Sequence, residues 1–152
     1  MIKTESEYRK AVVKVREERQ RIEGEQFRLK QESVPDDLIN LALDPLISFM
    51  LQLEEEIQFY ERIKRGVFPS LNNLGGIGNL LVALRINKGI SQKDLAHRLG
   101  VKESQISRDE KNEYRGASIE RVSEVLKALG AQVVSHVNTE VRDVSSLAEA
   151  SA

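Results

Sequence analysis

Residues 91–110, SQKDLAHRLGVKESQISRDE, contain the pattern that decides the fold. Ser91 is a typical N-cap in front of a short helix expected over residues 92–99, and Gly100 permits the left-handed backbone conformation that ends that helix. Ala96 is small where a second helix would cross closely, and that second helix is expected from Lys102 or Val101 to about residue 111. The spacing predicts two short helices joined by a sharp turn, an arrangement whose second helix can enter the major groove of DNA.

Three carboxylates, those of Glu103, Asp109 and Glu110, stand on this second helix in a chain whose net charge is -1. A DNA-reading helix with so much negative charge needs its carboxylates to point in different directions. At about 100° per residue, Asp109 is rotated away from Arg108, and Glu110 is expected to point inward. The groove-facing surface is then predicted to consist of Ser104, Gln105 and Arg108, with Glu103 at its leading edge.

Composition excludes several classes of site. The 152 residues include no cysteine, which excludes disulfides and thiolate metal sites, and the only histidines are His97 and His136, too far apart in sequence for a plausible zinc site. The charged start of the chain does not resemble a signal peptide, and no apolar run of about 18 residues is long enough for a membrane span. We therefore expect a soluble, cytoplasmic protein without metal or cofactor.

Charge is unevenly distributed along the chain. Residues 1–75 carry 12 Lys and Arg against 14 Asp and Glu, residues 76–130 carry 10 against 7, and residues 131–152 carry 1 against 3. The middle region is the only one with a positive balance, so contacts with phosphate are expected there.

The N-terminal region, residues 1–66, predicts a helical hairpin used for dimerisation or partner binding. Thr4 and Glu7 form a capping-box pattern, and an apolar residue recurs every seven positions along a helix expected from about residue 5 to about residue 32. Pro45 follows Asp44 as if it were the first residue of a helix. The apolar surface on offer exceeds what one thin hairpin can cover, which favours self-association or a partner.

Beyond the hairpin we expect a linker over residues 67–76, whose glycines lack the spacing of a phosphate-binding loop. A compact helical domain is predicted over residues 77–130, with Ser118 capping its last helix. The alternating residues of 131–140 predict a short β-strand that pairs with a second copy of the chain, and residues 141–152 a flexible tail. The fold class is therefore all-α, a hairpin followed by a four- or five-helix domain, with one C-terminal strand.

Residues 77–130 resemble the Cro/lambda-repressor, or XRE-type, helix-turn-helix family, through LRINKGISQKDLAHRLGVKESQISRDE and the later LKALG. The resemblance implies a dimer that binds double-stranded DNA at a palindromic operator. It implies a phosphate contact for Gln92 and an internal ion pair between Arg85 and Glu110. Asp109 departs from the family, where that position is usually apolar, so it either faces solvent or pairs with a nearby arginine. The implied DNA-binding residues are Gln92, Lys102, Glu103, Ser104, Gln105, Arg108, Asn112, Tyr114 and Arg115.

The overall architecture resembles HigA-type antitoxins, in which a helical part accompanies a toxin protein and the helix-turn-helix represses the shared promoter. The segment AQVVSHV resembles the strand with which HipB-type antitoxins dimerise. These resemblances predict a repressor that is the antitoxin of a toxin-antitoxin pair and regulates its own operon. The alternatives are a free-standing regulator and an adaptor that no longer binds DNA. An enzyme is disfavoured because the sequence offers no nucleophile, metal or phosphate constellation.

Overall fold

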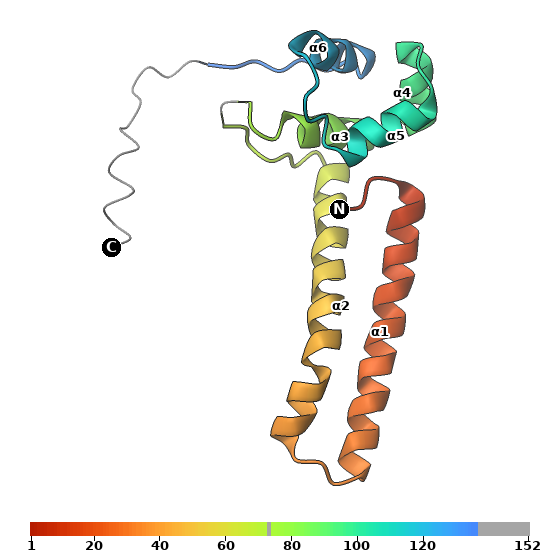
Figure 1. Cartoon of the computed structure of the whole chain (residues 1–152), viewed down its shortest axis with the longest axis vertical. Helices are drawn as coiled ribbons and strands as arrows, with labels where there is room; N and C mark the ends of the chain where they lie inside the picture. Colours follow the sequence, from red (N-terminus) through yellow and green to blue (C-terminus); the bar gives the residue numbers. More distant parts are fainter. Residues whose placement is uncertain (73, 137–152) are drawn as a thin grey trace, which may run out of the picture.

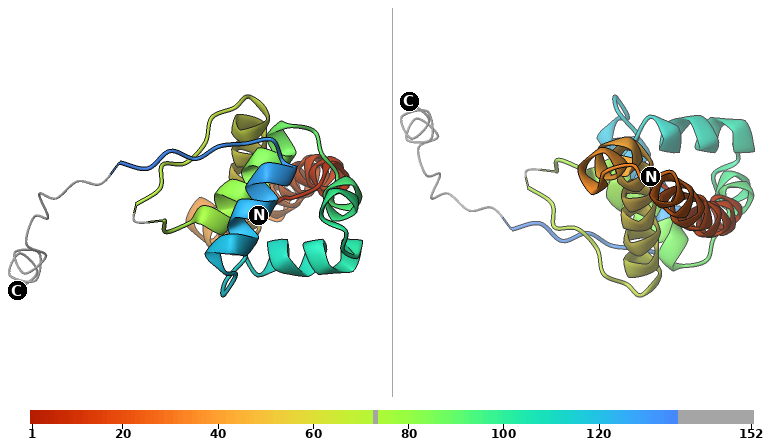
Figure 2. Two further views of the ribbon diagram at one scale, coloured as in Figure 1. Left: turned by 90° about the horizontal axis from the view of Figure 1, so that it is seen from above. Right: turned by 90° about the horizontal axis from the view of Figure 1, so that it is seen from below.

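The computed structural model describes residues 1–72 and 74–136, and within them the chain is helical, with no β-strand. Two long helices, α1 (Glu5–Gln31) and α2 (Asp36–Lys64), form an antiparallel hairpin (Figure 1). Four shorter helices follow, α3 (Ile77–Asn87), α4 (Gln92–Leu99), α5 (Glu103–Lys111) and α6 (Ile119–Ala128). Seen along the hairpin, they gather across the end where the N-terminus lies (Figure 2). The predicted all-α class is therefore confirmed.

Local caps explain where the helices begin. At the start of α1 the Glu7 backbone N–H donates to the Thr4 hydroxyl over 3.2 Å, while the Thr4 N–H donates to the Glu7 carboxylate over 3.0 Å. Ser91 and Asp94 make the same reciprocal pair at α4, and Ser118 caps α6. Each cap satisfies backbone donors that have no partner inside the helix.

The expected helix start at Pro45 is wrong. Residue Pro45 lies inside α2, which runs unbroken from Asp36 to Lys64. Its missing N–H leaves the carbonyl of Leu41 without the usual partner, but Leu41 is 70% exposed, so water can reach that turn. On the other side of the helix Ile39 and Leu43 are 1% and 2% exposed, and this packing against α1 holds the helix together across the proline.

The seam between α1 and α2 is partly polar. Glu18 is buried at 4% exposure where an apolar side chain would pack better. Its carboxylate pairs with the Lys14 ammonium over 2.8 Å and lies 3.6 Å from Arg21. The hydrogen bond from Lys14 holds the pKa of Glu18 below its usual value. Burial of this charge gives the hairpin less apolar contact than its length would allow.

The hairpin and the four shorter helices share one hydrophobic core. Ile2, Tyr60 and Ile63 belong to the same buried cluster as Leu81 and Ile106. Tyr60 stacks on Tyr8 with ring centroids 5.0 Å apart, and burial raises the pKa of Tyr60 to about 12. The division at residues 67–76 stays a prediction, but a fragment that begins after the hairpin would lack part of this core.

The predicted strand over residues 131–140 is not seen. Residues 131–136 have no regular secondary structure, and residues 137–140, like the predicted tail over 141–152, lie outside the described residues. An isolated strand has no ladder partner, so pairing with a second copy remains a prediction.

Gly78 is required by close packing. A Cβ built at this position would lie 1.8 Å from the carbonyl oxygen of Glu113, in the loop after α5. The start of α3 can therefore approach that loop only without a side chain at residue 78.

We expect Gly78→Ala to lower the free energy of unfolding by about 1–3 kcal/mol, because the backbone must move apart to admit the methyl group. Gly24→Ala in α1 is the control, since a Cβ there would meet no described atom within 4 Å beyond its chain neighbours and the nearby backbone of α1. That change should raise stability by about 0.5–1 kcal/mol through helix propensity. Urea denaturation followed by circular dichroism measures both, and equal effects would contradict the packing argument.

Candidate DNA-binding surface

α4 and α5 are held at a sharp angle by the turn that joins them. Gly100 has φ +65°, and the Val101 N–H donates to the Ala96 carbonyl over 3.0 Å. Leu95 and Ile106 are both fully buried, and Ala96 is 3% exposed. These contacts leave the opposite face of α5 open to solvent, as the sequence pattern predicts.

Most of the predicted contact residues are exposed, either on α5 or next to its ends. Ile106 and Glu110 mark the inner face of α5. Gln92 is half-buried, and Tyr114 is buried at 6% exposure. The exposed members are Lys102, Glu103, Ser104, Gln105, Arg108, Asn112 and Arg115.

Tyr114 does not lie on the surface predicted for it. The Tyr114 backbone takes a left-handed conformation with φ +52°, and the ring lies in the core. Burial raises the pKa of its hydroxyl above the usual range, and the carboxylates of Glu110 and Asp109 add to the shift. Among the residues that the structure describes, none is a hydrogen-bond partner of the hydroxyl. The Tyr114 side chain therefore packs in the core beneath the loop after α5, and a DNA contact by this residue stays a prediction.

Arg85 and Glu110 form the predicted ion pair. Their side chains are 4% and 0% exposed, and the guanidinium meets the carboxylate through two hydrogen bonds, one of them 2.7 Å long from Nη2 to Oε2. Arg85 Nη1 also donates to the Ile90 carbonyl over 2.9 Å. A planar guanidinium suits this bidentate geometry, and the pair ties α3 to α5.

The start of the chain reaches the same pair, which sequence reasoning did not foresee. Arg85 Nη2 donates to the Lys3 carbonyl over 3.0 Å, and the Lys3 ammonium donates to the Glu110 carbonyl. Both contacts join residues more than eighty positions apart, and nothing local in the sequence signals them. Lys3 thereby links the N-terminal segment to the end of α5.

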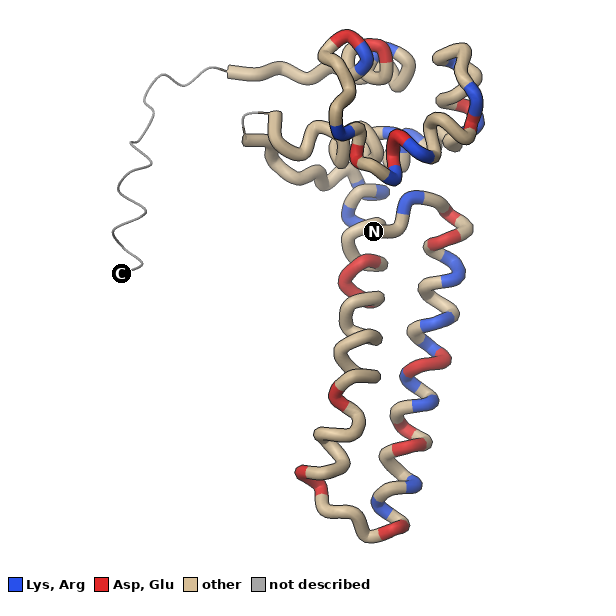
Figure 3. Tube along the Cα trace, viewed as in Figure 1, with Lys and Arg blue, Asp and Glu red and all other residues tan. Residues whose placement is uncertain are grey.

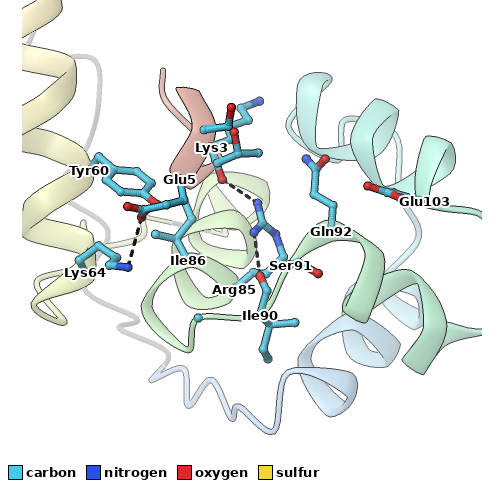
Figure 4. A pocket seen from close by; sticks show the side chains of 13 residues that line it. Lys3, Glu5, Tyr60, Lys64, Arg85, Ile86, Ile90, Ser91, Gln92 and Glu103 are labelled. Atoms are coloured by element: carbon cyan, nitrogen blue, oxygen red, sulfur yellow. Dashed lines mark hydrogen bonds and ion pairs between the residues drawn. The ribbon is translucent and has the colours of Figure 1, made fainter. Parts of the chain in front are cut away.

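The side-chain amide of Gln92 is already hydrogen-bonded within the protein. Its side-chain Nε2 donates to the Glu110 carboxylate over 2.8 Å. The same side chain lines a cleft of about 520 Å³ between the hairpin and the other helices (Figure 4), together with Lys3, Ser6 and Glu103. A phosphate contact by the Gln92 amide would replace or share the bond to Glu110.

Asp109 pairs with an arginine, which settles the alternative left open by the sequence. Its carboxylate lies 3.6 Å from Arg121 of α6, and the two side chains are 29% and 20% exposed. Arg121 also lies 3.3 Å from Glu124. At the position where the family usually has an apolar residue, this chain therefore has an ion pair between α5 and α6.

Comparison with known families gives one match. Residues 81–133 match the family described as Helix-turn-helix. This segment is an XRE-type helix-turn-helix domain. The chain is accordingly a DNA-binding transcriptional regulator, and the partner of this domain is double-stranded DNA. Searches of curated proteins and of solved structures found no match for the chain.

The matched segment begins inside α3 and contains the whole of α4, α5 and α6. Among the residues that the structure describes, no helix is both long and apolar enough to cross a membrane. In the same residues, no group of three or more His, Asp or Glu side chains could hold a metal ion.

We expect Arg85→Met to lower the free energy of unfolding by about 3–5 kcal/mol, because the Glu110 carboxylate would stay buried without its cation. The double variant Arg85→Met/Glu110→Met should lose less, since no charge is left unpaired. Arg115→Ala is the matched control: its pair with Glu113 is exposed, so it should cost at most about 1 kcal/mol. Chemical denaturation compares the three, and a single variant no worse than the control would contradict the role of the pair.

Proposed function

We propose that the chain is a dimeric, sequence-specific repressor that occupies an operator overlapping a promoter. Two copies of α5 would read half-sites about 34 Å apart, one turn of DNA. The observation that supports this is the division of α5 into two faces. Ser104, Gln105 and Arg108 are exposed together, whereas Asp109 and Glu110 are paired on the side of α3 and α6.

Arg108 is proposed as the principal base-reading residue. An exposed arginine on the open face of α5 can donate two hydrogen bonds to guanine in the major groove. Arg115, 77% exposed in the loop after α5, and the amide of Gln92 are proposed to contact phosphates. Glu103 is exposed at the first turn of α5, where it either accepts from cytosine or favours the positive end of the helix dipole.

We expect Arg108→Ala to weaken operator binding by about 1–3 kcal/mol and to relax discrimination at one base pair, because it removes a base contact. Arg115→Ala should weaken binding evenly across sequences and reduce the salt dependence by about one counterion, since it removes a phosphate contact. Glu103→Gln should leave affinity equal or better. Fluorescence anisotropy on selected genomic fragments at several salt concentrations measures all three variants.

Unchanged affinity and selectivity for Arg108→Ala would show that α5 is not the reader. An absence of salt-dependent binding to any fragment would favour the adaptor, in which the same domain serves only protein contacts. Neither outcome would depend on a catalytic activity, and the proposal assigns none to this chain.

An antitoxin role is the proposed specialisation. It rests on the resemblance to HigA-type antitoxins and on the long hairpin, whose acidic balance suits a protein partner better than DNA. The test is co-expression with the neighbouring gene: a stable complex with a small basic protein, whose toxicity the chain suppresses, would support it. If no neighbouring product binds, the free-standing regulator is favoured.

For the C-terminal segment we expect deletion of residues 131–152 to weaken self-association, because an isologous strand pair would be lost. Operator affinity should fall with it, since binding two half-sites requires the dimer. Sedimentation measures the first effect and anisotropy the second. A dimer of unchanged stability after the deletion would place the interface elsewhere on the chain.

A further inference from the structure

Positive charge is concentrated in the first half of α1. Residues 8–16, YRKAVVKVR, contain no carboxylate and four cations, Arg9, Lys10, Lys14 and Arg16. Residues 32–44, at the turn of the hairpin and the start of α2, contain four carboxylates and no cation. α1 is therefore basic where it approaches the helix-turn-helix domain, and the acidic balance of the hairpin lies toward its far end (Figure 3). We call residues 8–16 the basic segment.

The basic segment begins next to the surface proposed for DNA. Ser6, at the start of α1, lines the cleft of about 520 Å³ together with Gln92 and Glu103, which stand in the first turns of α4 and α5 (Figure 4). Arg9 and Lys10 follow Ser6 by three and four residues, so they neighbour it on the helix surface, one turn further from the cleft. The two cations therefore continue the surface that Gln92 and Ser6 begin.

Of the two hairpin helices, α1 is the one on the side proposed to face DNA. Seen along the hairpin, α1 lies on the side of α4 (Figure 2). α2 instead packs against α3, where the Asn87 side chain donates to the Ile63 carbonyl over 3.1 Å. The first helix of a helix-turn-helix crosses the DNA backbone while the second lies in the groove. A strand that passes the first turn of α4 therefore lies beside the start of α1.

The two carboxylates just before the basic segment are already engaged. The Glu5 carboxylate lies 3.6 Å from the Lys64 ammonium of α2. The Glu7 carboxylate caps its own helix, where it accepts the backbone N–H of Thr4 over 3.0 Å. Because a paired charge presents a weaker field than a free one, these groups oppose a nearby phosphate less than their number suggests.

Arg9 and Lys10 are accessible to a ligand. The Arg9 side chain is 77% exposed, and its pair with Glu5, 3.5 Å long, joins two exposed groups and so holds it weakly. Lys10 is exposed, and within residues 1–72 and 74–136 no carboxylate pairs with it. Lys14, by contrast, is engaged by the buried Glu18 over 2.8 Å. Two cations in the second turn of α1 can therefore meet an anion without breaking a buried contact.

We propose that the start of α1 binds the DNA backbone, with Arg9 and Lys10 pairing with phosphates on the strand that also meets the Gln92 amide. The proposal rests on the proposed repressor, whose phosphate contact at Gln92 it extends from the helix-turn-helix domain to the hairpin. Contacts with phosphate carry no base information, so these two add affinity and salt dependence without changing sequence preference. The acidic far end of the hairpin is repelled by DNA and stays available to a protein partner.

The test compares two double variants of the full chain, Arg9→Gln/Lys10→Gln and Arg28→Gln/Lys30→Gln. Both remove two exposed cations from α1, but Arg28 and Lys30 lie at its far end, so net charge is matched and position differs. All four side chains are exposed, so the helix content measured by circular dichroism should equal that of the wild type for both variants.

Fluorescence anisotropy over a series of salt concentrations measures binding to genomic fragments selected with the wild-type chain. For Arg9→Gln/Lys10→Gln, the slope of log affinity against log salt should fall by about two, and affinity near 0.1 M salt should fall about three- to tenfold per cation. The order of preference among fragments should stay the same, because every sequence offers the same phosphates. Arg28→Gln/Lys30→Gln should keep the wild-type slope and affinity.

Hydroxyl-radical footprinting locates the contact on the DNA. The sugars that lose protection with Arg9→Gln/Lys10→Gln should lie on the same strand as those that lose protection with Gln92→Ala, and next to them. Protection lost at an unrelated position would overturn the assignment to the strand beside α4.

The outcomes separate this proposal from the repressor on which it rests. Wild-type slope and affinity for Arg9→Gln/Lys10→Gln would overturn the α1 contact, leave operator binding intact and favour an acidic protein as the partner of the basic segment. Equal losses for the two double variants would also overturn it, because net charge and not position would then be responsible. If the wild-type chain binds no fragment at all, the repressor fails and the α1 contact fails with it.

Discussion

The guanidinium of Arg85 is the point on which the rest of the arrangement depends. It carries a charge with almost no access to water, so every hydrogen bond it makes has to come from the protein. Glu110 supplies two, Ile90 one and Lys3 one, and these partners lie on α5, on the turn before α4 and on the N-terminal segment. One buried cation thus positions three separate parts of the chain relative to α3.

This arrangement also accounts for the acidic character of α5. Glu110 is not available to repel phosphate because it neutralises Arg85, and Asp109 is engaged with Arg121 on α6. Two of the helix's carboxylates therefore act as its attachments to the domain. The exposed side keeps Arg108 and neutral polar groups, with Glu103 at its edge. A helix can be acidic in composition and still present a surface suited to DNA.

The contact between Lys3 and Glu110 gives the hairpin a direct connection to α5, the helix proposed to read DNA. The hairpin is joined to the domain at two places, through the chain after α2 and through this N-terminal segment, and Ile2 and Ile63 enter the shared core. Because the cleft beside this junction is lined by both Ser6 and Gln92, the start of α1 lies next to the surface proposed for DNA. The start of the hairpin and the proposed DNA-binding surface therefore line the same cleft.

The sequence by itself determined the elements whose signals are local. Helices begin at the caps Thr4, Ser91 and Ser118, because these side chains accept hydrogen bonds from backbone N–H groups a few residues away. α4 ends at Gly100, because this residue adopts a left-handed backbone conformation. The resemblance to the helix-turn-helix family predicted the Arg85–Glu110 pair and the open face of α5. Tertiary structure decided what depends on distant neighbours: that α2 continues through Pro45 because α1 supports it, that Tyr114 turns inward, that Gln92 bonds to Glu110, and that Lys3 reaches α5. Those outcomes follow from contacts between residues far apart in the chain, and no propensity or spacing in a single sequence records which surfaces will meet.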